Sequence, residues 1–438
     1  MYLLYNLIII ISIPFLIPFL LIKLALQKKY RTGIKERIGL IPDEISIKTK
    51  GKMVFWVHAV SVGEVTAAIP LINAIKERYP HWVIIISTVT ETGNSIARER
   101  FPENDVIFFP LDIIFIVKSV IEKINPSLFI FMETEIWPNI LYLLSRKNIP
   151  SILINGRISS RSFKRYNRIR PFLRKVLERI TLFSMQSDRD VEHIVKLGAD
   201  PEKAIRTGNI KYDQSITKDI DDPNVLRKEL NIGEGIDIII AGSTHEGEEK
   251  EILRSYSHLL KKGHKIILII APRHLDRIEK IIDLTRIMDI RYIRKSQINR
   301  ETPSISRGDI IILDTLGELS RYYQIAAIVF VGGSLVPVGG HNILEPAASG
   351  KAVIFGPYMD NIAEISEEFK KRGCGIEVSD SSEFTQKAEE LLTDKKLLKK
   401  IEGDALQLIK ENQGVVLTNI ELIDKTINSY RLISPDQR

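Results

Sequence analysis

Two successive series of short apolar runs alternate with amphipathic segments along most of the chain. The first series of expected strands comprises residues 53–60, 83–88, 106–109, 128–132, 152–154 and 182–185, and the second comprises 236–241, 266–270, 310–313, 328–331 and 352–355. Segments of helical length and period, such as 65–78, 113–124 and 140–147, lie between the strands. Strands that are apolar at consecutive positions are buried on both faces, as in a parallel sheet covered by helices. The pattern predicts two doubly wound α/β domains.

The boundary between the domains is expected in the polar, acidic stretch 214–223. This divides the chain into a domain over 28–213 and a domain over 224–438, with a last helix that can pack back on the first domain. A chain of 438 residues is long enough for two cores of this size. Ligands of such sheets bind beyond the carboxyl ends of the strands, and we expect two such ends to face each other across a cleft.

The chain begins with an uncharged segment, residues 2–22, whose only amide is Asn6. Its length suffices for a helix to cross a hydrocarbon core. Basic residues follow the segment instead of preceding it, so it is expected to stay attached as a membrane anchor over 1–27, with the later domains cytoplasmic. Pro14 and Pro18 would bend such a helix, so a segment lying in one leaflet remains open, as does a buried core helix.

A stripe of positive charge lies in the region 157–179, which carries nine basic residues and one acid. The net charge of the whole chain is +7. Such a stripe attracts phosphates, although a solvated helix face is an equally good explanation. Its candidate members are Arg157, Arg161, Lys164, Arg165 and Arg168. No nucleic-acid-binding motif accompanies the stripe, so a nucleic-acid partner is not expected. The single cysteine, Cys374, excludes an internal disulfide and suits a reducing compartment.

A glycine-rich segment, residues 332–346, follows the expected strand 328–331. Its glycines permit positive-φ backbone and close approach to a ligand, and the helix expected from Ile343 offers N–H groups to a phosphate. Glu345 could accept hydrogen bonds from ribose hydroxyls, or it could be an ordinary acid in a first helical turn. The segment matches neither the dinucleotide fingerprint nor the phosphate loop of triphosphate hydrolases.

Three further loops of the second domain also follow expected strands: residues 243–247, 272–274 and 314–318. Arg273 could clamp a phosphate bidentately. Taken singly, each loop could equally serve as a turn or a helix cap.

In the first domain, residues 58–64 end a strand and open a helix, which makes Glu64 a candidate general base. The position at a helix N-terminus argues against this, because it stabilises the ionised carboxylate. Glu133 and Glu135 follow the end of another expected strand, 128–132. One of them is expected to face the cleft, and the other is expected to cap the next helix. The Asp-x-Asp pattern at 188–190 is expected to cap a helix, since side chains two apart do not converge on one ion. No metal site is expected.

Seven motifs, taken together, resemble those of 3-deoxy-D-manno-octulosonic acid (Kdo) transferases, and the resemblance covers nearly the whole chain. They are SVGE at 61–64, METEIWPN at 132–139, GNIKYD at 208–213, STHEGEE at 243–249, PRH at 272–274, DTLGEL at 314–319 and GGSLVPVGGHNILEP at 332–346. The resemblance implies a GT-B fold of two facing Rossmann-like domains with an N-terminal membrane-anchoring helix. It also implies inverting, metal-independent transfer of Kdo from CMP-Kdo to lipid A precursor (lipid IVA), without a cofactor, on the cytoplasmic side of the bacterial inner membrane.

The same resemblance implies roles for individual residues. Glu64 would be the general base, and Glu133 and Lys211 would stabilise the transition state. The residues that would contact CMP are Arg273, His274, Leu316, Gly317, Glu318, Asn342, Ile343, Leu344 and Glu345. The basic stripe would meet the phosphates of the lipid acceptor and of the membrane. A nucleotide-sugar epimerase and a non-catalytic nucleotide-binding adaptor remain the alternatives.

Overall fold

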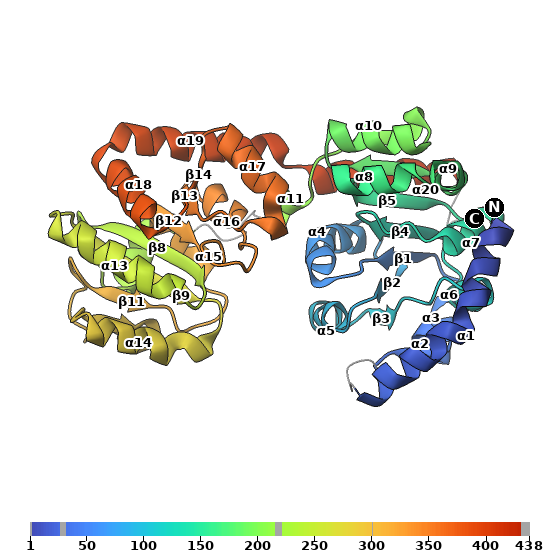
Figure 1. The fold of residues 1–438 in the computed structure, drawn as a ribbon, viewed down its shortest axis with the longest axis horizontal. Coiled ribbons are helices and arrows are strands. Elements are labelled where there is room, and N and C mark those ends of the chain that lie inside the picture. Colours follow the sequence, from blue (N-terminus) through green and yellow to red (C-terminus); the bar gives the residue numbers. More distant parts are fainter. Residues whose placement is uncertain (1, 27–31, 215–220, 300, 431–438) are drawn as a thin grey trace. The chain divides into compact units, whose positions relative to one another are not determined.

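The computed structural model describes residues 2–26, 32–214, 221–299 and 301–430, and the chain divides into two compact units (Figure 1). The first unit comprises residues 1–214 and 414–438, and the second comprises 215–413. Each unit contains one seven-stranded sheet in which the paired strands run parallel. The predicted α/β class with two parallel sheets is therefore confirmed.

The first sheet has the strand order β3-β2-β1-β4-β5-β6-β7. Its strands are β1 (Val54–His58), β2 (Val83–Thr88), β3 (Asp105–Phe108), β4 (Leu128–Met132), β5 (Ser151–Gly156), β6 (Leu182–Met185) and β7 (Ala204–Arg206). The central strands β1, β2, β4 and β5 are buried along their whole length, as their continuous apolar runs predict.

The second sheet has the order β10-β11-β9-β8-β12-β13-β14. Its strands are β8 (Asp237–Thr244), β9 (Ile266–Pro272), β10 (Tyr292–Arg294), β11 (Ile310–Ile312), β12 (Ile328–Val331), β13 (Ala352–Phe355) and β14 (Gly375–Glu377). β8 and β9 share the longest register of this sheet, which is shifted between Gly242 and Thr244 where β8 ends.

Three strands escaped the sequence analysis: β7, β10 and β14. Each has three residues and lies at an edge of its sheet. Their side chains are mostly half-buried or exposed, so their sequences lack the apolar run that marks a buried strand. Pairing with the neighbouring strand, more than local pattern, defines them.

Helices cover both sheets (Figure 1). Those of the first unit are α1 (Tyr2–Leu26), α2 (Ile34–Arg37), α3 (Asp43–Thr49), α4 (Val62–Arg78), α5 (Glu91–Arg100), α6 (Ile114–Ile124), α7 (Pro138–Arg146), α8 (Ser160–Asn167), α9 (Arg170–Leu177), α10 (Asp188–Leu197), α11 (Lys211–Gln214) and α20 (Val415–Ser429). Those of the second are α12 (Pro223–Glu229), α13 (Glu248–Lys261), α14 (Ile278–Ile287), α15 (Leu319–Tyr322), α16 (Leu344–Ala348), α17 (Ala363–Lys371), α18 (Ser381–Thr393) and α19 (Lys395–Asn412).

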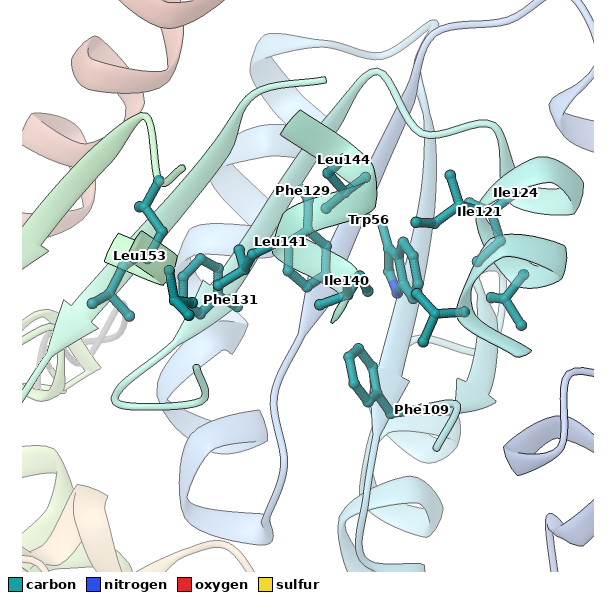
Figure 2. Packing of buried hydrophobic residues seen from close by; sticks show 14 of the residues in the cluster. Trp56, Phe109, Ile121, Ile124, Phe129, Phe131, Ile140, Leu141, Leu144 and Leu153 are labelled. Carbon is teal, nitrogen blue, oxygen red and sulfur yellow. The ribbon is translucent and has the colours of Figure 1, made fainter. Parts of the chain in front are cut away.

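An aromatic cluster fills one face of the first sheet (Figure 2). Trp56 of β1 and Phe129 of β4 lie edge to face, with ring centroids 5.1 Å apart, and the Trp56 indole N–H donates to Ser87 Oγ at 2.8 Å. Ile121 of α6 and Ile140 of α7 belong to the same cluster and are fully buried. This packing fixes the carboxyl ends of β1 and β4, where candidate site residues follow.

The last helix, α20, belongs to the first unit although the preceding helices belong to the second. Asp213 caps it, since its carboxylate accepts the N–H groups of Gly414 at 2.8 Å and Val416 at 2.6 Å. Ile420 and Ile423 of α20 join the core on the α4 side of the sheet. The chain therefore crosses between the units twice.

Helix α1 is joined to the first unit by polar contacts near its start. The Tyr5 hydroxyl donates to Asp112 Oδ2 at 2.9 Å, and the amides of Asn6 and Asn139 exchange hydrogen bonds at 3.0 and 2.9 Å. Within the described ranges, no helix combines the length and apolar character needed to cross a bilayer. The predicted anchor over 1–27 includes side chains at 13 and 16–26 and whole residues 1 and 27 that lie outside the described part, so a membrane-spanning helix stays a prediction.

Candidate functional site

The sheet of each unit has a topological switch point. There the first strand lies between two neighbours, and the chain adds later strands on both sides of it. In the first sheet β1 lies between β2 and β4, and in the second sheet β8 lies between β9 and β12. The crevice beyond the carboxyl ends of such a strand pair is where open α/β sheets bind ligands. The candidate residues follow these strands in each unit.

Glu64 occupies the switch point of the first unit, in the first turn of α4. Its Oε2 accepts the N–H of Val60 at 2.9 Å, and its Oε1 accepts the hydroxyl of Ser61 at 3.0 Å. Burial raises the pKa of the carboxyl to about 7, with Glu133 and Glu135 raising it further and the two hydrogen bonds opposing. Desolvation therefore outweighs the helix position that argued against a base in the sequence analysis.

Two more carboxylates lie at the same switch point. Glu133 directly follows β4 with a φ of 55°, a strained conformation for a residue with a side chain, and its N–H donates to Ile154 O at 3.0 Å. Burial also raises the pKa of Glu135. Neither acid caps α7, contrary to the sequence analysis. Asp112 does so, accepting the N–H groups of Asn139 at 3.0 Å and Ile140 at 3.1 Å.

Lys211 begins α11, a short helix that packs against α4, the helix of Glu64. Its backbone N–H donates to Asn209 Oδ1 at 3.1 Å, which fixes the start of the helix. The lysine therefore belongs to the same unit as Glu64 and Glu133.

The switch point of the second unit carries basic groups. His245 follows β8, Arg273 and His274 follow β9, and His341 lies in the loop after β12. The imidazole planes of His245 and His341 are within 7° of parallel, with centroids 5.0 Å apart, and their Nε2 atoms are 2.8 Å apart. His274 meets His245 edge to face at 5.8 Å. The sequence analysis assigned Arg273 and His274 to the donor and left His245 and His341 without a role.

Glu248 ties the loops of this switch point together. Its Oε2 accepts the N–H groups of His245 at 2.9 Å and Gly333 at 2.8 Å, and its Oε1 accepts those of Ser334 at 3.0 Å and Leu335 at 2.9 Å. The carboxylate is buried in the first turn of α13. The sequence contains this residue within the motif at 243–249, but its role depends on the loop after β12 and could be seen only in three dimensions.

The glycine-rich loop therefore differs from the expected phosphate cradle. Three of its N–H groups are taken by Glu248, and the N–H of Leu344, at the start of α16, donates to Asn342 Oδ1 at 3.0 Å. Gly333 has a φ of 66°, and a Cβ there would lie 3.1 Å from the His341 ring and 3.4 Å from the His245 ring. The loop uses its glycine to seat the two imidazoles.

Glu345 and Asn342 form a pair beside this loop, because the Asn342 amide donates to Glu345 Oε1 at 3.0 Å. Burial raises the pKa of Glu345, and the hydrogen bond from Asn342 opposes this effect. The neighbouring residues Ile343 and Leu344 are buried, so only their backbone is available to a ligand.

The loop 314–318 presents Leu316 and Gly317 at the surface, and the Leu316 side chain is 79% exposed. Glu318 is half-buried and accepts hydrogen bonds from Thr315 and from Lys295, the latter at 3.0 Å. Burial raises the pKa of Glu318, but these hydrogen bonds and the positive charges nearby outweigh it and hold the pKa below its usual range.

Four members of the predicted basic stripe come together on α8 and at its end. A cavity of about 540 Å³ is lined by Arg161, Ser162, Lys164, Arg165 and Arg168. None of these cations has an ion pair with an acid among the described residues. Arg157 follows β5 and does not line the cavity, although Thr134 donates to its carbonyl oxygen. The Asp-x-Asp pattern at 188–190 was expected to cap α10, but the cap is Ser187, whose Oγ accepts the Asp190 N–H at 3.2 Å, and both acids lie in the first turn of the helix.

Comparisons with known proteins identify related sequences over most of the chain. A family model described as 3-deoxy-D-manno-octulosonic-acid transferase (kdotransferase) matches residues 32–214. A 3-deoxy-D-manno-octulosonic acid transferase of Haemophilus influenzae is 33% identical over 425 residues, which are 96% of this chain and 97% of that relative. A bifunctional glycosyltransferase/methyltransferase of Fusobacterium nucleatum is 34% identical over 98% of this chain, which spans 64% of that relative's length.

Among solved structures, a glycosyltransferase from Rickettsia africae matches 85% of this chain and 98% of its own, with a TM-score of 0.54 and 15% sequence identity. At this identity the likeness concerns the fold alone, and it confirms the GT-B type of two α/β units. From its sequence similarity to the Haemophilus enzyme over nearly their full lengths, the chain belongs to the 3-deoxy-D-manno-octulosonic acid transferase family of glycosyltransferases.

Proposed function

We propose that this protein transfers Kdo from CMP-Kdo to the lipid A precursor lipid IVA, with inversion at the anomeric carbon and with Glu64 as general base. Membership of the family supports the Kdo transfer. The observation that carries the mechanism is the environment of Glu64, whose buried carboxyl has a pKa raised to about 7. A base with a pKa near the working pH is both unprotonated and strong enough to accept a hydroxyl proton.

In the proposed reaction Glu64 removes the proton of the acceptor hydroxyl as that oxygen attacks the anomeric carbon of Kdo. The bond from this carbon to the phosphate of CMP breaks, and its electron pair leaves with the phosphate. Positive charge grows on the sugar and negative charge on the leaving group. Glu133 and Lys211 are proposed to stabilise these two charges, respectively.

The second unit is proposed to hold CMP. The Arg273 side chain is exposed at the carboxyl end of β9 and suits a phosphate, while Glu345 suits the ribose hydroxyls. His274 and the loop residues Leu316, Gly317 and Glu318 complete the proposed contacts, together with Asn342, Ile343 and Leu344. A monophosphate carries less charge than a diphosphate, so we propose that these groups suffice without a metal ion.

We also propose that α1 attaches the protein to the cytoplasmic face of the bacterial inner membrane. Its exposed apolar side chains are Leu3, Leu4, Leu7, Ile8, Ile10, Ile11 and Phe15. The ring of Phe172, on α9, lies 5.4 Å from that of Tyr5, so the basic region adjoins α1. Apolar burial and attraction to anionic lipid act together in such a surface. The basic cavity at α8 is proposed to take the phosphates of the lipid acceptor.

The test is to incubate the purified protein with CMP-Kdo and tetra-acylated lipid A precursor, with and without a chelator, and to weigh the lipid product. The expected product is heavier by Kdo in both samples. Loss of transfer in the chelator would contradict metal independence, and an unmodified lipid accompanied by a changed donor sugar would favour an epimerase.

Glu64→Gln tests the base, because it keeps the size and removes the charge. We expect turnover to fall by about 10²-fold to 10⁴-fold while CMP affinity is retained. The matched control is Glu44→Gln, an exposed acid in the first turn of α3 in the same unit. If the turnover of Glu64→Gln were close to that of Glu44→Gln, Glu64 would not be the general base, and a non-catalytic adaptor would be favoured.

A further inference from the structure

His245 and His341, at the second switch point, share one hydrogen bond. With the Nε2 atoms 2.8 Å apart, only one of these nitrogens can carry a proton while the other accepts it. Neither Nδ1 atom has a hydrogen-bond partner among the described residues. The ring that donates through Nε2 therefore keeps a lone pair on Nδ1 when it is neutral, and this atom can take a second proton without breaking the pair.

The groups that face the pair come from several elements. Arg273 and His274 after β9 oppose a positive charge on it, while Glu248 and Glu249 of α13 favour one on His245. Burial is the largest effect and lowers the pKa of both rings, that of His341 to about 4. The pair is therefore neutral at neutral pH when no anion is bound.

Binding of an anion changes the protonation of the neutral histidine pair beside Arg273. A phosphate within hydrogen-bond distance favours the charged form of an imidazole and offsets both the burial and the repulsion from Arg273. The added proton on Nδ1 then becomes a donor to a phosphate oxygen. The pair lies at the carboxyl ends of β8 and β12, the switch point at which open α/β sheets hold phosphates.

We propose that His245 and His341 form a phosphate-binding pair that takes up one proton when the phosphate of the nucleotide binds. This inference rests on the proposed function for the identity of the nucleotide. It adds a second phosphate ligand beside Arg273, one whose charge appears only in the complex. It also predicts a link between donor binding and pH that arginine, which is always protonated, cannot supply.

Isothermal titration of CMP into the full-length protein measures the uptake directly. The binding enthalpy is recorded at about pH 7.5, where the phosphate of CMP, with a second pKa of about 6, is already dianionic. Repeating the titration in buffers of different ionisation enthalpy yields the number of protons exchanged. We expect an uptake approaching one proton and, by linkage, an affinity that falls up to about tenfold per unit of rising pH.

His245→Gln and His341→Gln keep a hydrogen-bonding side chain that cannot be protonated. We expect each to abolish the uptake and to flatten the pH dependence of CMP affinity. Cytidine, which lacks the phosphate, should bind the variants and the wild type alike, which shows that the site is intact. His258→Gln, an exposed histidine on α13, is the matched control and should leave the uptake unchanged.

The outcomes separate the two proposals. CMP binding without proton uptake, or uptake that persists in both glutamine variants, overturns the role of the histidine pair alone. A wild-type protein that does not bind CMP overturns the proposed donor, and the pair's role with it.

Discussion

The two switch points have the same strand arrangement and opposite chemistry. In the first unit three carboxylates, Glu64, Glu133 and Glu135, gather where β1 and β4 end, whereas in the second His245 and His341 meet beside Arg273 where β8 and β12 end. Burial raises the pKa of Glu64 and lowers that of His341, so in both places it favours the uncharged form. A shared topology thus positions side chains, and the local residues decide whether the crevice accepts a proton or holds an anion.

The two crevices also differ in how their loops are held. In the first unit the two hydrogen bonds that the Glu64 carboxylate accepts from described residues both come from residues just before it in the chain. In the second, Glu248 joins backbone groups that are 85 or more residues away in sequence. The Glu64 carboxylate is therefore held by local contacts, whereas Glu248 joins loops that follow two different strands.

The largest effect is expected from Glu248→Ala, which would leave four N–H groups without their acceptor. Each buried donor left unsatisfied costs about 1–3 kcal/mol, and since water can reach part of the loop we expect a loss of roughly 3–5 kcal/mol in the free energy of unfolding. Denaturant unfolding measures this loss. Glu251→Ala, on the same helix, is the control and should cost about 1 kcal/mol, because its carboxylate contacts only side chains, the exposed Arg254 and the Ser381 hydroxyl, among the described residues. Equal losses would show that Glu248 does not organise the loops.

Gly333→Ala is expected to have the next largest effect, about 2 kcal/mol, because it adds backbone strain and presses a methyl group against both imidazoles. Gly263→Ala is the matched control, since Gly263 also has a positive φ, of 93°, but a Cβ there would meet nothing within 4 Å. Denaturant unfolding of the two variants separates strain from contact. The same loss in both would mean that the glycine does not seat the histidine pair.

Periodicity alone predicted the buried strands and the two-sheet architecture, because a strand covered on both faces needs an unbroken apolar run. The position of Glu64 was equally predictable, since it lies at the start of the helix that follows the first strand. Its raised pKa was not, because burial and the charges of Glu133 and Glu135 depend on neighbours across the sheet. The role of Glu248 and the pairing of His245 with His341 were hidden for the same reason, as each joins loops from two different strands.

Glu133→Gln would remove a like charge near Glu64 and so lower the pKa of the Glu64 carboxyl. If Glu64 is the base, the rate of Kdo transfer should rise with pH up to about 7 in the wild type and level off above it. In the variant this rise should shift to lower pH by about half a unit to one unit. The midpoint of the acid side of the kcat/KM pH profile measures this shift. The midpoint is compared, and not the rate itself, because the variant is also expected to be slower. An unmoved midpoint would contradict the coupling of the carboxylates.

Ser61→Ala should move the same midpoint the other way and by the smallest amount. The Ser61 hydroxyl donates to Glu64 Oε1 and so favours the charged carboxylate, which lowers its pKa. Without this donor the pKa should rise, and the pH profile of kcat/KM should shift upward by a few tenths of a unit, since burial and the Val60 N–H are unchanged. Opposite shifts in Ser61→Ala and Glu133→Gln would identify Glu64 as the titrating group, because both residues act on its carboxyl. A general loss of stability would not shift the midpoint in opposite directions in the two variants. Shifts of the same sign would instead place the titrating group elsewhere.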